Sequence, residues 1–572
     1  MKVFQLLVAR PVPPVPSDHL FVTAAAARIR ASVLAGATIV CTTLLGAQPR
    51  PDTVTTTLLL ASHPWLAGDG RFTDVQRVVR DARTADSTSG LRWTASNGTA
   101  TAAASAALVH VRSDAETGRA EQVDIAVLDS LATRFKTRKA TPVERGLFDI
   151  ALDIVIARHA FVHRQGQVDP SRVHAEWSLA APDLDLTTVR TSLASGADAA
   201  SVFAGLEPQT RSYQLLVSAL TEVRRQDADT TQHLPAAPAR AVATGGRYAD
   251  AQPLALVLQR LGELPSGFDV TKVAQTYTKP LSDAVARWQN RKMKRGRVTG
   301  TLTPTALARL MDEYETRGER IALAIERWRW LPRTFSNDPL VVNLPEFRLH
   351  TYGRFQGDSA DPLSMNVVIG RADSNATPVF SANMTQVVFS PRWHVPKSIM
   401  LGEIGPAATR DSGYLAKHNY ELTSTGGRLL ATTPQNIARI GTSVYVRQRS
   451  GDDNSLGKVK FLLPNPYDIY LHDTPSRSLF SRNRRDFSHG CVRLGNPMAM
   501  ARYVLANQPA WTDSKITEAM NAGVERFVRV ARPIPVLIVY QTAVADPDGS
   551  LRYFNDVYGH DRTLADALEK VR

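Results

Sequence analysis

The sequence predicts a multidomain α+β protein that is helical in its N-terminal half and mostly β-structured toward its C-terminus. Three observations lead to this fold class. The chain has 572 residues, enough for about three to five domains of roughly 100–200 residues each. Apolar residues recur at helical spacing up to about residue 230. After about residue 318, short runs of branched apolar residues separated by polar breaks take over, and these are typical of strands.

The composition limits the class of protein and the kind of partner. Hydrophobic residues make up 43% and charged residues 21%, which excludes a wholly disordered or fibrous chain. The net charge of +14 favours an anionic partner, either nucleic acid, a membrane surface or an acidic polymer such as cell wall. The chain has no zinc-finger spacing, no aromatic RNA-binding strand and no dense basic arm, so we expect no nucleic acid partner.

The N-terminus carries the pattern of an export signal. Arg28 and Arg30 precede an apolar run over 31–45, and small residues at 46–47 resemble a cleavage site. An uncleaved signal anchor in the inner membrane is the alternative, because the run is close to the shortest length that spans a bilayer. We therefore predict an exported protein of the periplasm or cell envelope. Cleavage would remove Cys41 and leave Cys491 as the one cysteine, with no intrachain disulfide.

Changes in composition and in the spacing of apolar residues predict the domain boundaries. Residues rich in Ala, Thr, Ser and Asp give way to apolar residues at helical spacing, and a Pro/Ala stretch at 234–239 indicates a linker. Leu254, Leu258 and Leu261 fall on one face of a helix. The predicted order is a signal peptide or anchor (1–47), a flexible lead-in (48–120), a helical scaffold domain (121–232), a linker (233–250), a three-helix module (251–312) and a mostly-β domain (318–572).

The last domain is predicted to be a curled antiparallel sheet or sandwich with an insertion. Strands are predicted, from their branched apolar content, at 340–344, 365–369, 386–389, 469–471 and 536–540. Residues of about 397–450, between two strand-rich blocks, mix helix and loop signals and look inserted.

The candidate catalytic residues lie around Cys491 in the sequence. It lies in the segment SHGCVR at 488–493, and His472, fifteen residues before that segment, closes a predicted strand. A thiol becomes a strong nucleophile when a neighbouring imidazole takes its proton. Gly490 permits a tight turn, backbone N–H groups there could hold an oxyanion, and the fork of Arg493 suits a carboxylate.

Three other interpretations of these residues stay open. Cys491 could be an inert core thiol, as lone cysteines often are. The two histidines could be core residues with satisfied hydrogen bonds. His472, His489 and Cys491 could bind zinc, but their spacing matches no standard structural site and no fourth ligand is evident, so we expect no metal and no cofactor.

The motif resembles the signature of YkuD-type L,D-transpeptidases. Segments outside the motif resemble the large YcbB-like subgroup of that family: ERWRWLP at 326–332, VNLPEFRLH at 342–350, PRWHVP at 391–396, GKVKF at 457–461 and LHDTP at 471–475. The resemblance implies a YkuD-type sandwich as the catalytic domain (318–572), with 397–450 as a substrate-capping lid. It also implies a peptidoglycan-binding-like module at 251–312.

The resemblance further implies a reaction and its site residues. Cys491 would attack the carbonyl before the terminal D-Ala of a tetrapeptide stem, release D-Ala and form a thioester. An amine of a second stem would then give a 3→3 cross-link. His472 would be the general base, its tautomer fixed by the carbonyl of Asp473. The substrate and oxyanion region would include Ser488, His489, Gly490, Arg493 and Asp473. Further candidates for carboxylate contacts are Arg348, Arg392, Arg484 and Arg485.

The implied partners are peptidoglycan stem peptides, with carbapenem β-lactams as covalent inhibitors. Two alternatives remain at this stage. One is an L,D-carboxypeptidase that resolves the same acyl-enzyme with water. The other is a non-catalytic cell-wall-binding protein with a decayed active site, although the intact pair of His472 and Cys491 argues against decay.

Overall fold

The computed structural model describes residues 91–116, 126–137, 140–175, 177, 179–292, 298–358, 361–411 and 413–570. The predicted signal segment over 1–47 and the first part of the predicted lead-in lie outside the described residues. These described residues form two compact units: one from those within 1–108, 124–158 and 186–197, the other from those within 109–123, 159–185 and 198–572. None of the described helices has both the length and the apolar character needed to cross a membrane.

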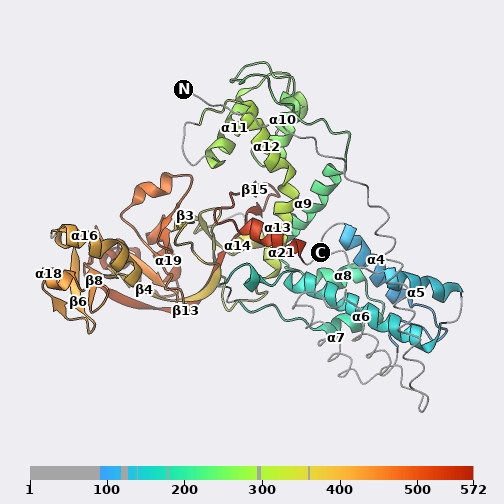
Figure 1. Cartoon of the computed structure of the whole chain (residues 1–572), viewed down its shortest axis with the longest axis horizontal. Coiled ribbons are helices and arrows are strands. Elements are labelled where there is room, and N and C mark those ends of the chain that lie inside the picture. The colour runs from blue at the N-terminus through green and yellow to red at the C-terminus, as the bar shows by residue number, and fades with distance from the viewer. Residues whose placement is uncertain are drawn as a thin grey trace, which may run out of the picture. The chain divides into compact units, whose positions relative to one another are not determined.

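The first unit is helical, and its described residues begin with a well-packed tryptophan. Its helices are α5 (Ala126–Thr137), α7 (Leu186–Ala194) and the first parts of α4 (Ala102–Glu116) and α6 (Pro142–Gln165) (Figure 1). The Trp93 side chain is fully buried, and its Nε1 donates a hydrogen bond to Oδ1 of Asp153 at 2.7 Å. Asp153 also accepts from Arg190 at 3.0 Å, so its charge is paired.

The prediction of a flexible lead-in over 48–120 is wrong for the residues that the structure describes. Residues 102–116 form α4, and Ala104, Ala107 and Leu108 on it are buried. An alanine-rich composition suggested a loosely packed segment. Alanine is also the best helix former, and its small side chain lets a helix pack closely, which explains the difference.

Several helices in the helical part of the second unit start at a side-chain cap. The hydroxyl of Thr210 accepts from the backbone N–H of Tyr213 at the start of one helix. The hydroxyl of Thr303 accepts from the backbone N–H of Ala306 at the start of another, whose first residue is Pro304. The helices are α8 (Ala199–Ala204), α9 (Arg211–Asp227), α10 (Ala251–Arg260), α11 (Lys279–Lys292), α12 (Pro304–Glu315) and α13 (Arg317–Arg329), with short 3₁₀ turns at Pro170–Arg172 and Val270–Lys272.

Three helices, α10 to α12, occupy the segment predicted as a three-helix module (Figure 1). Leu254, Leu258 and Leu261, which the spacing placed on one helix face, are all buried in the core that these helices share. Glycan binding by this segment stays a prediction.

A curled β-sheet that closes on itself forms the centre of the C-terminal part. Its strands run in the order β11-β3-β12-β10-β9-β4-β13-β1-β2, and β2 also pairs with β3, which closes the ring. The strands are β1 (Leu340–Asn343), β2 (Arg348–Thr351), β3 (Met365–Gly370), β4 (Phe380–Phe389), β9 (Val459–Leu462), β10 (Leu471–His472), β11 (Asp486–Ser488), β12 (Val492–Leu494) and β13 (Arg526–Val539).

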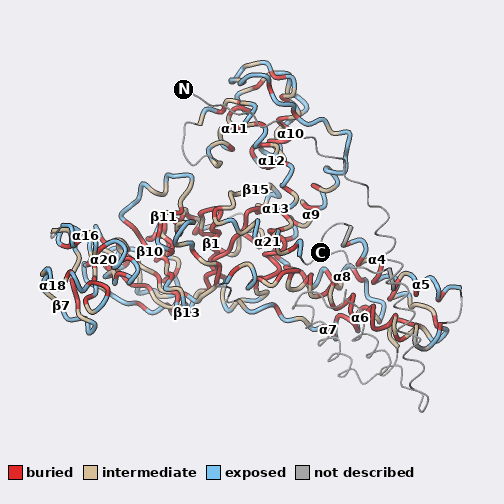
Figure 2. The backbone as a smooth tube through the Cα atoms, viewed as in Figure 1, coloured by how far each residue is buried: buried red, intermediate tan, exposed pale blue. Residues whose placement is uncertain are grey.

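The pairing of these strands is mixed, which corrects the expectation of an antiparallel sheet or sandwich. β1 pairs with β13, β10 with β12 and β11 with β3 in parallel, while the other pairs are antiparallel. Local sequence patterns predict strands but not their partners, and β1 and β13 lie far apart in the chain. Buried residues run along these strands (Figure 2), and the core inside the sheet includes Val342, Leu349, Val367, Val387 and Phe461.

Helices and a hairpin complete this part of the chain. They are α14 (Gly353–Gln356), the 3₁₀ turn η5 (Arg477–Ser481), α19 (Pro497–Val504), α20 (Asp513–Asn521), β14 (Ala543–Ala545), β15 (Leu551–Tyr553) and α21 (His560–Glu569).

The inserted subdomain, residues 397–450, lies between two strands that pair with each other. β4 and β9 are antiparallel neighbours, with Phe389 opposite Val459. The insertion therefore starts where β4 ends and returns where the neighbouring β9 begins. It has its own apolar core, including Met400 and Leu422. Its elements are α15 (Lys397–Ile399), the π-helical turn η4 (Met400–Ile404), α16 (Gly405–Arg410), α17 (Tyr414–Lys417), β6 (Tyr420–Ser424), β7 (Leu429–Leu430), α18 (Pro434–Ile437) and β8 (Val444–Gln448), the last paired with β5 (Trp393–His394).

Candidate active site

The pairing of β10 with β12 brings the predicted nucleophile and base to one face of the sheet. The strands are parallel, with Leu471 opposite Val492 and His472 opposite Arg493. Leu471 and Val492 are fully buried in the core. Side chains alternate along a strand, so His472 and Arg493 lie on the opposite face, and Cys491 shares that face. His472 and Cys491 are therefore on neighbouring strands, offset by two residues.

His472 is held as a neutral ring with a defined tautomer. Its Nδ1 lies 2.5 Å from the carbonyl oxygen of Asp473. A carbonyl only accepts, so Nδ1 carries the proton and Nε2 is left as the basic nitrogen. Burial and the positive charge of Arg493 lower the pKa of His472 to about 3, although the carbonyls of Asp473 and Leu456 oppose this. The imidazole is thus uncharged at neutral pH.

The turn that supplies this carbonyl is fixed by the Asp473 side chain. Its carboxylate accepts from the backbone N–H of Lys458 at 2.8 Å and of Thr474 at 2.7 Å, and it pairs with Arg477. Gly457 makes this approach geometrically feasible. It has a φ of +61°, and a Cβ there would lie 2.4 Å from the Asp473 carboxylate.

Cys491 is a protonated thiol in the resting site. The residue is half-buried, and its Sγ donates to the carbonyl oxygen of Asp468 at 3.7 Å. Burial raises the pKa of the thiol to about 11, although hydrogen bonds from Tyr470 and the charge of Arg493 act in the opposite direction. The thiol and the imidazole are therefore both neutral in the resting site.

Tyr470 and Asp468 were not identified from the sequence as site residues. Tyr470 directly precedes β10, and its ring centroid is 5.7 Å from that of His472. Its hydroxyl hydrogen-bonds with the thiol and with the side chain of Trp393. The alternation along the strand that ends at His472 was a signal that could have found Tyr470. The carbonyl of Asp468 is set by a φ of +54°, which the sequence does not reveal.

Hydrogen bonds of two hydroxyl groups stabilise the turn before Cys491. Gly490 has a φ of +116°, a conformation that favours glycine. Its N–H donates to Oγ of Ser488 at 3.2 Å, and Ser488 donates to the carbonyl of Cys491 at 2.6 Å. Thr377, which the sequence did not single out, donates to the carbonyl of Gly490 at 2.7 Å. The N–H of Gly490, expected in the oxyanion region, is thus engaged within the turn.

His489 contacts the inserted subdomain. Its Nε2 lies 2.7 Å from Oε1 of Glu403, and both side chains are partly exposed. Glu403 belongs to η4, so the insertion reaches the loop that carries the nucleophile. His472, His489 and Cys491 are not among the described side chains that converge closely enough to hold a metal ion.

The predicted carboxylate-binding arginines differ in their availability. Nε of Arg493 is buried without a hydrogen-bond partner, so this group remains available to a ligand. Arg484 is bound through both nitrogens to Asp486, at 2.5 and 2.7 Å. Arg485 donates to the backbone carbonyls of Val367 and Phe347. These two arginines therefore serve the fold in this state, whereas Arg493 faces the site.

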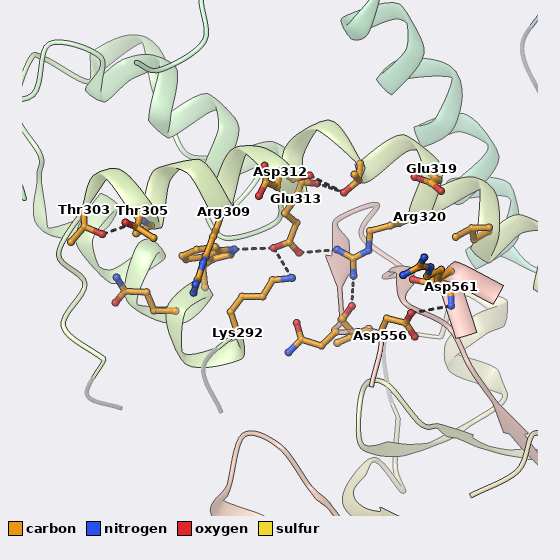
Figure 3. A pocket seen from close by; sticks show the side chains of 18 of the residues that line it. Lys292, Thr303, Thr305, Arg309, Asp312, Glu313, Glu319, Arg320, Asp556 and Asp561 are labelled. Atoms are coloured by element: carbon orange, nitrogen blue, oxygen red, sulfur yellow. Dashed lines mark hydrogen bonds and ion pairs between the residues drawn. The ribbon is translucent and has the colours of Figure 1, made fainter. Parts of the chain in front are cut away.

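A large cavity of about 1230 Å³ lies between α11, α12, α13 and residues 554–562 (Figure 3). Burial opposes the ionisation of Glu313 there, but Arg291, Lys292 and Arg320 outweigh it and lower its pKa to about 2. Arg320 also donates to the carbonyl of Thr542 at 3.2 Å. These cations are thus paired with Glu313, and they join the three-helix segment to the end of the chain.

Alkylation of Cys491 by iodoacetamide is expected to accelerate about tenfold per pH unit between pH 7 and 9.5, because only the thiolate reacts and its pKa is about 11. Mass spectrometry of the peptide that contains Cys491 measures this rate separately from Cys41. An unstructured peptide with one internal cysteine, whose pKa is about 8.5, is the control and should level off first. A plateau for Cys491 near neutral pH would show a preformed ion pair and contradict the neutral pair.

Gly457→Ala is expected to lower the thermal unfolding midpoint more than Gly427→Ala does. Both glycines have positive φ, which costs an alanine about 1–2 kcal/mol. A Cβ at Gly427 meets nothing within 4 Å, whereas one at Gly457 collides with the Asp473 carboxylate. Equal losses in the two variants would mean that the close approach of Asp473 contributes nothing to stability.

Comparisons with known proteins agree with this geometry. Residues 338–515 match the YkuD family, an L,D-transpeptidase catalytic domain, and 86–220 match a scaffold domain family. The second match begins before the predicted scaffold boundary at 121 and includes α4. An L,D-transpeptidase homologue from Haemophilus influenzae is 30% identical over 248 residues, which is 43% of this chain and 49% of the relative. The chain thus spans about half the length of that relative. The β-rich C-terminal part of the chain is similar to the catalytic domain of YkuD-type L,D-transpeptidases.

Proposed function

We propose that the protein is a peptidoglycan L,D-transpeptidase that forms 3→3 cross-links through a thioester on Cys491. The observation that carries this proposal is the shared face of β10 and β12, where His472 and Cys491 lie on neighbouring strands. The match of 338–515 to an L,D-transpeptidase catalytic domain supports the substrate class. The scaffold match supports, in addition, a place in the large YcbB-like subgroup.

Acylation begins from the neutral pair. Nε2 of His472 takes the thiol proton as sulfur attacks the carbonyl carbon that precedes the terminal D-Ala of a tetrapeptide stem. The carbonyl oxygen becomes an oxyanion. The hydroxyl of Tyr470, which contacts the thiol, is placed to donate to it. The tetrahedral intermediate then collapses, the C–N bond breaks, and His472 returns its proton to the leaving amine of D-Ala.

The second half-reaction uses the same proton acceptor. An amine of another stem attacks the thioester carbon, and His472 takes a proton from that amine. The C–S bond breaks, the sulfur regains a proton and the cross-linked product leaves. Water in place of the amine would give a tripeptide, which is the L,D-carboxypeptidase alternative. The balance between these outcomes depends on the acceptor site.

Positive charge around the base suits an anionic stem peptide. Arg493 and Lys460 lie on the strands that flank β10, both opposite His472 in register. Burial lowers the pKa of each of these two side chains, which indicates that they are poorly solvated. A poorly solvated cation with an unpartnered donor, such as Nε of Arg493, gains most from a substrate carboxylate. The same charges hold His472 neutral until the thiol proton arrives.

We further propose that the protein is exported, acts in the periplasm or cell envelope and takes carbapenems as covalent inhibitors. The net charge of +14 fits a cell wall that carries stem-peptide carboxylates, although salt screens this attraction.

The function is tested with soluble protein and disaccharide-tetrapeptide stems. Liquid chromatography with mass spectrometry should find 3→3 cross-linked dimers and free D-Ala, and both should be absent with Cys491→Ala. Tripeptide without dimers would establish the carboxypeptidase instead. If neither product forms and meropenem leaves the intact mass unchanged, the cell-wall-binding alternative is favoured.

His472→Ala is expected to slow acylation by meropenem about 10²–10⁴-fold, because the general base is lost. His489→Ala is the matched control. His489 contacts Glu403 and not the thiol, so its loss should have a much smaller effect. Stopped-flow measurement of the acylation rate separates the two. A larger loss in the His489 variant would move the role of base to that residue.

Replacement of residues 397–450 by a short Gly-Ser linker is expected to impair turnover of the stem substrate while the sheet stays folded. The subdomain has its own core, and the paired ends of β4 and β9 hold the junction together. Circular dichroism reports the fold, and product formation reports turnover. Unchanged turnover in a folded variant would exclude a lid, and global unfolding would show that the segment is structural.

A further inference from the structure

Three histidines and an aspartate on two helices converge far from the catalytic motif in the chain. His110 and Asp114 are four residues apart on α4, and His159 and His163 are four residues apart on α6. Residues at this spacing lie on the same face of a helix, so each helix presents two ligand groups together. All four residues belong to the second compact unit.

The ligand atoms lie at the separations that a bound cation imposes. Oδ2 of Asp114 is 3.3 Å from Nε2 of His110, 3.3 Å from Nε2 of His159 and 2.9 Å from Nε2 of His163. The Nε2 atoms of His159 and His163 are 3.1 Å apart. A tetrahedral zinc ion with ligand bonds of about 2.0–2.1 Å places its ligands roughly 3.3 Å from one another. These four separations are close to that value, and all four ligand atoms lie within 4.8 Å of one another.

Hydrogen bonds alone account poorly for this cluster. Nε2 of His110 is buried and has no hydrogen-bond partner, although Oδ2 of Asp114 is close by. The ring of His159 is completely buried, and its Nδ1 also has no hydrogen-bond partner.

Groups around the cluster complete the environment of a structural metal site. Nδ1 of His163 lies 2.9 Å from Oε1 of Glu207, which is the carboxylate contact that orients metal-bound histidines in proteins. The buried ring of Phe203 stacks on His110, with centroids 5.1 Å apart, and meets His159 edge-on at 4.6 Å. The apolar ring of Phe203 and the carboxylate of Glu207 thus flank the cluster.

We propose that His110, Asp114, His159 and His163 bind a Zn²⁺ ion that joins α4 to α6. Four protein ligands fill a tetrahedral zinc site, so the ion is structural and leaves no position for a substrate. Imidazole nitrogen with one carboxylate suits zinc better than magnesium or calcium, which prefer oxygen ligands.

The site is linked to the helix that leads into the catalytic part. Oε1 of Glu207 accepts from Arg329 at 3.0 Å, and Nε of Arg329 donates to the hydroxyl of Tyr213 at 3.1 Å. Arg329 is the last residue of α13, shortly before residues 338–515, which match the YkuD family. The proposed zinc ion would therefore stabilise the support of α13 as well as the pairing of α4 and α6.

The test uses full-length protein that has been dialysed against EDTA and then titrated with ZnCl₂. We expect one zinc per chain by plasma mass spectrometry and a higher thermal unfolding midpoint in the zinc-loaded protein. Co²⁺ in place of Zn²⁺ should give the intense visible bands of a tetrahedral site. Asp114→Asn and His159→Ala should each abolish stoichiometric binding. Glu207→Gln should weaken it roughly 10–100-fold.

Two controls separate this site from other ligands. His233→Ala removes an exposed histidine that is paired with Asp250, and Cys491→Ala removes the catalytic thiol. Both should bind one zinc like the unaltered protein. The proposal is overturned if the folded, unaltered protein binds no zinc at micromolar concentration. It is equally overturned if folded Asp114→Asn keeps full stoichiometry and the cobalt bands.

Discussion

The parallel register of β10 with β12 is the constraint on which the site depends. Burial of Leu471 and Val492 in the core fixes which face each strand presents, and Tyr470, His472, Cys491 and Arg493 then have to share the other face. A slip of one residue would turn the whole set into the core, so the register is set by hydrophobic burial and not by the polar groups. The chemistry is thus positioned by apolar residues that take no part in it.

Electrostatics then determine the resting state. Burial lowers the basicity of His472 and raises the pKa of Cys491, and the nearby positive charge of Arg493 keeps the imidazole uncharged. The same arginine favours the thiolate, so it stabilises the sulfur once a proton has been lost. A site of this kind keeps its nucleophile protonated until a substrate brings an electrophilic carbon to the sulfur. This would limit side reactions of the thiol with oxidants and disulfides.

The sequence alone was enough to propose the site residues, but it was less informative about the fold around them. The motif at 488–493 and the distant His472 were readable because one short segment and one strand end carry them. The roles of Tyr470, Thr377 and Glu403 could not be predicted in this way. They come from strand pairing and from an insertion that contacts the loop with the motif. The closed mixed sheet was missed for the same reason, since local patterns do not specify partners. His110 and Asp114 were overlooked because alanine-rich composition hid a helix, although the spacing of His159 and His163 was visible.

The proposed reaction requires that a neutral imidazole with an unprotonated Nε2 accepts the proton of a neutral thiol. Nitrogen-15 NMR of protein labelled in histidine, with the His472 signals assigned by comparison with a His472→Gln variant, tests this directly. We expect that Nδ1 is protonated, that Nε2 is unprotonated and that neither shift changes between pH 5 and 8. An imidazolium signal from His472 at pH 7, or a proton on Nε2 in place of Nδ1, would contradict it.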